Sequence, residues 1–121
     1  MARRSDARGG MPGTEESMLM ARIFVCHPYA GDPAGNAAAV RRIARRIALQ
    51  GHVPIAPQRY LPQFIDEATE RDLALRLCLE LVAASDILEI HGDEITDGMR
   101  REITEARWRG IRILKGVGDG D

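Results

Sequence analysis

The sequence predicts a three-layer α/β fold, in which a short parallel sheet of four to five strands lies between helices. Two observations predict it. Short β-branched or aromatic runs alternate along the chain with helical patterns, and the connections between them are short. Such alternation is typical of βαβ units, whose strands pair in parallel and are covered by helices. At 121 residues, the chain has room for one such domain, of the flavodoxin- or Rossmann-like kind.

The first half of the domain holds the clearest helical pattern. Residues 21–26 read Ala-Arg-Ile-Phe-Val-Cys, a run that predicts a central strand. The next helix, for which Asn36 is a candidate N-cap, has apolar residues on one face and arginines on the other. Its apolar residues are Val40, Ile43, Ala44, Ile47 and Ala48. Gly51 follows, where a left-handed residue commonly ends a helix, and a second strand is predicted over 52–56.

The second half of the domain repeats the alternation. A helix is predicted over 67–84, a strand over 86–90, a helix over 98–109 and a last strand over 111–114. The first of these helices carries more apolar side chains, chiefly leucines, than one helix face accommodates. It therefore either lies deep in the domain or packs against a partner on its second face.

The two ends of the chain differ from the domain between them. Residues 1–20 are rich in Arg, Gly, Ser and Glu without apolar periodicity, so we interpret them as a disordered tail or a misplaced translation start. The domain is expected over 21–115, and a flexible end is expected over 116–121.

Composition narrows the classes of function. The chain has 17 basic and 18 acidic residues, whereas a dedicated nucleic-acid binder has a basic surplus. No apolar run reaches the roughly 18 residues that a membrane span needs. Cys26 and Cys78 lie within apolar segments, which favours free thiols in the reducing cytoplasm. The expected partner is a small molecule rather than a nucleic acid or a membrane.

The predicted topology places a binding site at the carboxyl ends of the strands. In open parallel sheets, ligands bind beyond these ends, where the strand order reverses. The loops at that edge span 27–34, 57–64 and 91–97, and they are the loops richest in polar and aromatic residues. The sequence has no phosphate-binding glycine loop, no dinucleotide-binding glycine motif and no His or Cys spacing typical of a metal site, so no cofactor or metal is expected.

Glu102 is the acidic residue that helix spacing singles out. Its neighbour Glu105 has Arg101 and Arg109 four residues before and after it, which is typical of a surface ion pair. Glu102 has no basic residue at these spacings, and its face continues into apolar positions. A carboxylate held there, near a helix N-terminus, is positioned to attack an electrophile. The alternative is a half-exposed helix Glu with a tertiary partner.

Further candidates stand at the strand ends. Asp93 directly follows the third strand and is a candidate to bind a ligand hydroxyl or to transfer a proton. Asp97 is expected to be an N-cap, and Asp86 to cap or end the preceding helix. His27 and His91 also stand at strand ends, where a histidine is more often a structural hydrogen-bonder than a catalyst.

Several segments form a combined pattern that covers about 22–114. They are Ile-Phe-Val-Cys-His-Pro-Tyr-Ala-Gly-Asp at 23–32, Asn36, Pro-Ile-Ala-Pro at 54–57, Tyr-Leu-Pro-Gln-Phe at 60–64, Ser-Asp-Ile-Leu-Glu-Ile-His-Gly-Asp at 85–93 and Asp-Gly-Met-Arg-Arg-Glu-Ile at 97–103. Together they resemble the nucleoside 2-deoxyribosyltransferase-like superfamily, in particular a small bacterial and phage branch of it.

The resemblance implies a catalytic glutamate. Active members open the last helix with a Gly-x-x-x-Glu element whose Glu is the nucleophile, and Gly98 and Glu102 match it. The implied reaction is a double displacement, in which Glu102 attacks C1′ of a (deoxy)ribonucleoside or its 5′-monophosphate, the base leaves, and water or another base completes the reaction. Asp93 would hold a sugar hydroxyl or assist the leaving base. The implied substrate-binding residues are His27, Pro28, Tyr29, Gly31, Asp32, Tyr60, Gly98 and Met99.

The chain also departs from the pattern of active members. Cys78 occupies the position at which active members have a further acidic residue that helps to protonate the base. Arg100 and Arg101 directly precede Glu102, and these two arginines would suit a phosphorylated ligand. The alternatives to an enzyme are a non-catalytic module that binds or senses a nucleotide, and an interaction protein built on the leucine-rich helix. Superfamily members commonly complete their sites across subunits, so a homodimer or larger homo-oligomer is expected.

Overall fold

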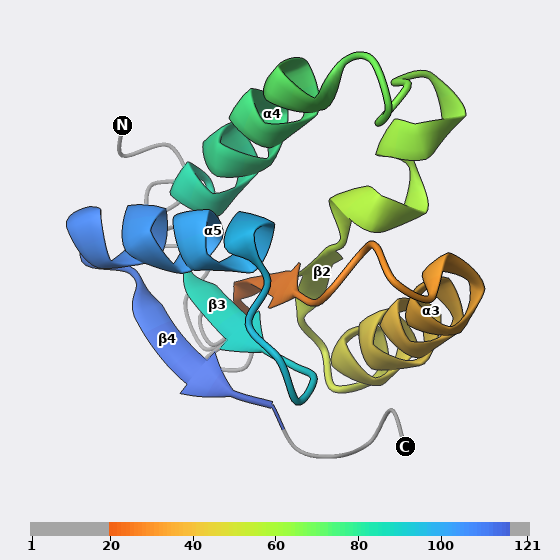
Figure 1. Ribbon diagram of the computed structural model, residues 1–121. Coiled ribbons are helices and arrows are strands. Elements are labelled where there is room, and N and C mark those ends of the chain that lie inside the picture. Colours follow the sequence, from red (N-terminus) through yellow and green to blue (C-terminus); the bar gives the residue numbers. More distant parts are fainter. Residues whose placement is uncertain (1–19, 117–121) are drawn as a thin grey trace, which may run out of the picture.

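A four-stranded parallel sheet forms the centre of the computed structural model, which describes residues 20–116 (Figure 1). α3 covers one face of the sheet, and α4 and α5 cover the other. In chain order the elements are β1 (Arg22–Cys26), α3 (Pro33–Leu49), β2 (Val53–Ile55), the 3₁₀ turns η1 (Pro57–Arg59) and η2 (Leu61–Gln63), α4 (Arg71–Ala83), β3 (Ile87–Ile90), α5 (Asp97–Trp108) and β4 (Arg112–Lys115). The predicted three-layer α/β fold is confirmed. The tail predicted over 1–20 and the end predicted over 116–121 lie, but for one residue each, outside the described residues.

The order of the strands creates a crevice at one edge of the sheet. The strands lie in the order β2-β1-β3-β4, and each neighbouring pair is parallel. From β1 the chain moves to β2 on one side and then to β3 on the other, so the order reverses between β1 and β3. In open α/β sheets, the crevice beyond the carboxyl ends at such a reversal is the usual ligand site. Here it lies between the loops that follow β1 and β3.

The alternation of side chains along β1 produces the two packed layers. Every residue from Ile23 to Cys26 is buried, and successive side chains point to opposite faces. The α3 layer contains Ile23, Val25, Val40, Ile43 and Ile47. The opposite layer contains Phe24, Cys26, Val82, Leu88, Met99, Ile103 and Ala106. Because β1 is buried on both faces, its sequence is a continuous apolar run without polar alternation.

Both N-cap predictions beside the crevice are wrong, because another residue nearby in the sequence caps each helix. α3 begins at Pro33, and the Asp32 carboxylate, rather than Asn36, accepts from the Gly35 amide at 3.2 Å. The Asn36 amide instead donates to backbone carbonyls of the preceding loop. At α5, the Thr96 hydroxyl accepts from the Met99 amide at 3.2 Å, so Asp97 is the first helical residue. Gly51 ends α3 as predicted, with a positive φ of 89°.

α4 is shorter than predicted, since it begins at Arg71 instead of at residue 67. The Asp66 side chain accepts from the Ala68 amide at 2.9 Å, and Glu70 accepts from the Asp66 amide at 2.8 Å, so this segment forms turns before the helix starts. Only two residues of α4 are fully buried, and its five leucines are all partly exposed. No helix within residues 20–116 is long and apolar enough to cross a membrane.

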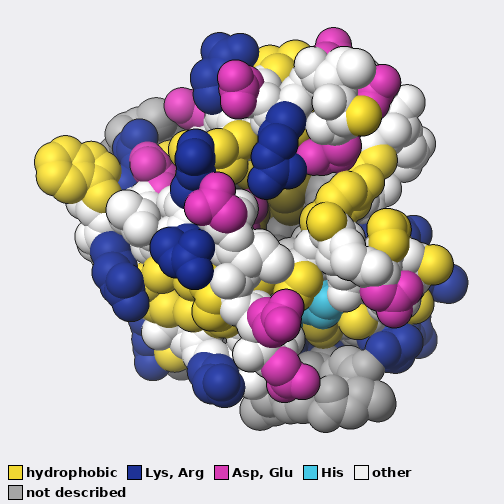
Figure 2. All heavy atoms as spheres, in the orientation of Figure 1, with side chains coloured by type: hydrophobic (Ala, Val, Ile, Leu, Met, Phe, Trp, Pro, Cys, Tyr) yellow, Lys and Arg dark blue, Asp and Glu magenta, His cyan; other side chains and the backbone are white. Residues whose placement is uncertain are grey.

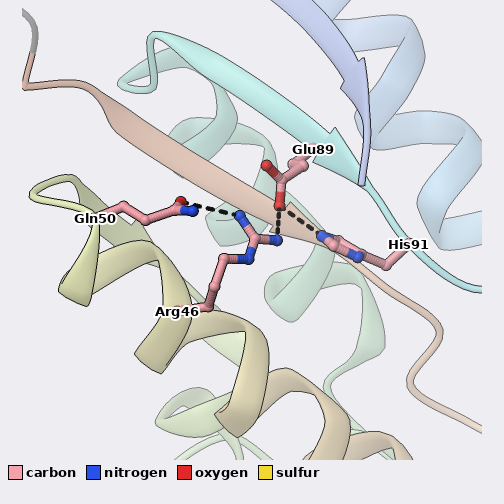
Figure 3. A network of polar contacts seen from close by, with 4 residues as sticks. All are labelled: Arg46, Gln50, Glu89 and His91. Carbon is pink, nitrogen blue, oxygen red and sulfur yellow. Dashed lines mark hydrogen bonds and ion pairs between the residues drawn. The ribbon is translucent and has the colours of Figure 1, made fainter. Parts of the chain in front are cut away.

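Glu89 links α3 to the sheet through a buried polar network (Figure 3). Its Oε1 accepts from Arg46 of α3 at 2.8 Å and pairs with Nε2 of His91 at 2.7 Å. Gln50 accepts from the other side of the Arg46 guanidinium at 3.4 Å. The contacts with His91 and Arg46 hold the pKa of Glu89 down at about 2, although burial opposes them. His91 therefore has a structural partner, as its position at a strand end suggested.

Candidate functional site

A cavity of about 140 Å³ opens beyond the carboxyl end of β1, between the turns that follow β2 and the start of α5. Its wall takes residues from the loop after β1, from η1, η2 and α4, and from the start of α5. In the space-filling view this hollow lies near the centre, with hydrophobic side chains in its depth and charged side chains around it (Figure 2). A cavity of roughly this size accommodates one small ring. An open groove shares Tyr29, Pro62 and Glu67 with the cavity, so a longer ligand can extend into it.

Glu102 contributes a carboxyl group to the wall of the cavity. The neighbouring buried residues of α5 are Met99, Ile103 and Ala106, so Glu102 stands at the border of the packed face. Glu105 is partly exposed and pairs with Arg109 at 2.6 Å, as the spacing predicted. Within residues 20–116, no ion pair to Glu102 is formed.

Burial makes the Glu102 carboxyl a weak acid. It raises the pKa of Glu102 to about 7, and the nearby Cys26 thiol, whose Sγ lies 3.9 Å from the Met99 carbonyl oxygen, opposes part of that rise. Burial, together with the negative charge of the nearby Glu102, holds the pKa of Cys26 far above its ordinary range, so this thiol stays protonated. Near neutral pH both forms of Glu102 are therefore populated, and the ionised form is a poorly solvated carboxylate. Such a group is suited to nucleophilic attack or to proton transfer.

His27 lines the cavity as a neutral imidazole. Its Nδ1 lies 2.9 Å from the Pro28 carbonyl oxygen, which can only accept, so Nδ1 carries the proton and Nε2 is the remaining acceptor. Burial lowers the pKa of His27, and the nearby His91, whose ring centroid is 6.4 Å away, lowers it further. A neutral histidine in this tautomer accepts a hydrogen bond or a proton from a ligand.

Gln58 is a residue of the wall that the sequence analysis missed. Its amide nitrogen donates to the carbonyl oxygens of His27 at 2.6 Å and of Pro28 at 3.3 Å, which fixes the loop after β1. These two acceptors also determine the orientation of the amide. Gln58 Oε1 is buried and has no hydrogen-bond partner among the described residues. The signal in the sequence is its place at the end of the second strand, in a loop that belongs to the binding edge.

The structure brings together four of the ten site residues that the sequence singled out. His27, Tyr29, Gly98 and Glu102 all line the cavity. The residues outside its wall are Pro28, Gly31, Asp32, Tyr60, Asp93 and Met99. Asp93 is exposed in the loop after β3, Met99 is 2% exposed in the core, and Tyr60 packs on Phe64 with ring centroids 6.0 Å apart. Of the two residues predicted to act in catalysis, only Glu102 therefore contacts the cavity.

The described residues offer no cluster of metal ligands. Within residues 20–116, no group of three or more His, Cys, Asp or Glu side chains is placed to hold a metal ion. The polar groups of the wall include the Glu102 carboxyl, the His27 imidazole and the Gln58 amide oxygen. These suit an organic ligand that is held by hydrogen bonds.

The raised pKa of Glu102 predicts that the Glu102→Gln variant gains stability over the wild type as the pH rises. The folded chain holds this proton up to about pH 7 and the unfolded chain only to about 4.5. Ionisation therefore destabilises the fold progressively between these values, by on the order of 3 kcal/mol in full. We expect the variant to be more stable than the wild type by about 2 kcal/mol at pH 8 and nearly equal at pH 4.5. Urea unfolding at the two pH values tests this, and a pH-independent difference would contradict it.

The fold and the site define an α/β protein with a cavity at the carboxyl edge of its parallel sheet. One solved structure with this fold is the 2-deoxyribosyltransferase from the psychrotolerant bacterium Bacillus psychrosaccharolyticus, described as a biocatalyst for the synthesis of antiviral and antitumoral nucleosides. It superposes with a TM-score of 0.65 at 18% identity, over 78% of this chain and 71% of that chain. At this identity the likeness establishes the fold.

The family of the chain follows from residues 21–115. They match the family described as Domain of unknown function (DUF7768), and the chain belongs to that family. A comparison with curated proteins gives no match. The matched range is the one over which the domain was predicted, and the activity depends on the residues of the site rather than on the fold.

Proposed function

We propose that this protein cleaves the N-glycosidic bond of a nucleoside or a nucleoside 5′-monophosphate through a covalent glycosyl–Glu102 intermediate. The observation that carries the proposal is the Glu102 carboxyl in the wall of the cavity, buried enough that its pKa rises to about 7. The place of the cavity at the carboxyl edge of the parallel sheet and the fold shared with a 2-deoxyribosyltransferase support it.

The proposed reaction has two displacements at C1′ of the sugar. A Glu102 oxygen attacks C1′, the C1′–O bond forms while the C1′–N bond breaks, and the electron pair of that bond leaves with the base. Water or a second base then attacks C1′ and releases the Glu102 carboxylate. Water gives hydrolysis and a second base gives transfer of the sugar, both with retained configuration. Since Asp93 lies outside the wall, no step is assigned to it.

A nucleotide-binding module without turnover is the second candidate function. Two observations favour it. A pKa of about 7 leaves much of Glu102 protonated near neutral pH, and a protonated carboxyl does not attack. The wall also contains Cys78, whose pKa burial raises to about 12, at the position where active transferases carry an acid. In this case a ligand would bind without losing its base.

Chromatography of free base distinguishes the two candidates. The wild-type protein is incubated with a panel of ribonucleosides, 2′-deoxyribonucleosides and their 5′-monophosphates, each alone and with a second base as acceptor. We expect base release from at least one compound, at a rate proportional to protein concentration. Calorimetric binding of a compound that releases no base under any condition would instead support the binding module.

The two free cysteines are relevant to the cellular compartment of the protein. Cys26 is buried, Cys78 is partly buried, and both are free. Burial raises the pKa of each thiol, and such thiols are poorly reactive as nucleophiles and towards oxidants. Free buried cysteines are common in reducing compartments. We propose the cytoplasm as the location of this protein.

The apolar surface of α4 predicts self-association. Leu73, Leu77 and Leu79 are partly exposed and belong neither to the core clusters nor to the cavity wall. We expect a dimer or larger assembly in sedimentation velocity at micromolar concentration, and a shift to monomer on replacing Leu73 and Leu77 by Asp. Leu49→Asp is the matched control, because Leu49 is exposed on α3. A monomeric wild type, or equal effects of both variants, would contradict the prediction.

A further inference from the structure

The cavity and its groove have an acidic lining. The carboxyl groups in their walls belong to Asp66, Glu67, Glu70, Asp97 and Glu102. Arg71 is the basic residue among these lining residues. Asp97 also approaches Arg100 at 3.7 Å and Arg101 at 3.4 Å, but these side chains are about 60% exposed, so water weakens both pairs. The excess of negative charge favours a ligand that carries positive charge.

Uncharged groups of the lining point to the same kind of ligand. His27 and Gln58 each use a donor on backbone oxygens of the loop after β1, which leaves Nε2 of His27 and Oε1 of Gln58 as acceptors. Gln58 Oε1 is buried without a partner. The groove adds the rings of Tyr29 and Phe64, whose faces attract cations. Acceptors and aromatic faces are complementary to a ligand that donates hydrogen bonds and is electron-poor.

The helix N-termini at this edge are occupied by acidic residues. A helix N-terminus is a common phosphate site, because its free amides and its dipole attract anions. At the start of α3 the Asp32 carboxylate accepts a hydrogen bond from the Gly35 amide. The first turn of α4 contains Asp72, and the first turn of α5 contains Asp97. The wall therefore suits the 5′-phosphate of a nucleotide poorly.

The chemistry of the leaving group requires an acid that the cavity wall provides poorly. A neutral nucleoside expels its base easily only if a proton reaches the base as the C1′–N bond breaks. Burial lowers the pKa of His27 and raises the pKa of Cys78 to about 12, so neither is a good proton donor near pH 7. Glu102 must be ionised to attack. A base that already carries a positive charge leaves as a neutral molecule and needs no proton.

We infer that the substrate of this site is an unphosphorylated N-glycoside with a cationic base, such as an N-glycosylpyridinium or a 7-alkylguanine nucleoside. The inference rests on the proposed function and names its substrate class. A Glu102 oxygen attacks C1′, and the electron pair of the C1′–N bond neutralises the ring nitrogen. Water then attacks C1′, the glycosyl–Glu102 bond breaks, and the proton of the water goes to solvent. Each turnover thus converts one cationic nucleoside and one water into free sugar, neutral base and one proton.

The test compares two nucleosides that differ by one methyl group and one positive charge. Release of 7-methylguanine from 7-methylguanosine is measured against release of guanine from guanosine, in both the ribo and the 2′-deoxyribo series. Each kcat/KM is divided by the uncatalysed rate constant of the same compound, because the cation is intrinsically more labile. We expect this ratio to be at least about tenfold higher for the cation, with one proton released per base in a pH-stat. Adding a 5′-phosphate is expected to lower it.

Variants locate the origin of the preference. Glu67→Gln is expected to reduce the preference for the cation severalfold, and Glu80→Gln, an exposed change on α4 outside the wall, is expected to leave it unchanged. Equal ratios for guanosine and 7-methylguanosine would overturn the inference while the proposed function stands. No release from either compound, with release from another compound of the nucleoside panel, would also overturn the inference alone, and no release from any compound of the panel would overturn both. Binding to the Glu102→Gln variant, which does not react, gives a second readout: tighter binding of guanosine than of 7-methylguanosine would also overturn the inference.

Discussion

Replacing Glu102 by Gln is expected to lower base release by at least about a thousandfold. Glutamine nearly matches glutamate in shape, so the wall of the cavity and the packing of α5 are preserved, but its amide does not attack C1′. The loss should appear in kcat, because the covalent step disappears while the other wall residues, among them Gln58, His27 and Tyr29, are unchanged. Quantifying free base by chromatography over long incubations, with the best substrate of the wild type, measures the effect.

The neighbouring Glu105 provides the control on the same helix. Glu105→Gln removes an exposed ion pair with Arg109 and leaves the cavity wall intact, so base release should change by less than about twofold. The thermal unfolding of Glu102→Gln should be at least as cooperative as that of the wild type. Comparable activity of a folded Glu102→Gln variant and the wild type would mean that another group performs the attack.

Replacing Glu89 by Ala is expected to lower the free energy of unfolding by about 3 kcal/mol at pH 7. The substitution leaves His91, which is 6% exposed, without its partner, and it removes the anion that holds Arg46 against the sheet. It also opens a gap between α3 and β3. Urea unfolding followed by circular dichroism measures the effect. Glu105→Ala, which breaks an exposed pair of similar length, should cost less than about 1 kcal/mol.

The pH dependence of this difference has a defined sign. The pKa of Glu89 is about 2 in the folded chain and about 4.5 in its ordinary state. The stabilisation is therefore fully present above about pH 4.5 and is lost as the pH falls towards 2, which corresponds to about 3 kcal/mol. The unfolding free energies of wild type and Glu89→Ala should converge in acid. An equal difference at pH 3 and pH 7 would show that packing, rather than the charge of Glu89, accounts for it.

Much of the fold was predictable because its signals are local. The apolar run at 21–26 and the spacing of Val40, Ile43 and Ile47 each fix an element without knowledge of the rest. The errors concern helix starts. At the starts of α3 and α5 a second polar residue can act as the cap, and at α3 the Asn36 amide is used by carbonyl oxygens of the preceding loop while Asp32 caps the helix.

The candidate site was predictable only in part. The absence of basic residues at helical spacing from Glu102 correctly predicted that it lies apart from the surface ion pairs. The contact of Cys26 with Glu102 joins residues 76 positions apart, and the position of Gln58 depends on carbonyls of the loop after β1. Such contacts follow from the order of the strands, which no local pattern of the sequence contains. The exposed position of Asp93 likewise depends on the path of the loop after β3.

The most direct test of the central claim is to trap the glycosyl–Glu102 intermediate. A nucleoside with fluorine at C2′ of its sugar slows both displacements, and a good leaving base restores the first, so the covalent species accumulates. The protein is incubated with such a compound and its intact mass is measured, followed by peptide mapping. We predict a mass increase of one fluorinated pentosyl group, located on Glu102 and absent from the Glu102→Gln variant. Base release without any covalent adduct, or an adduct on another residue, would contradict the account.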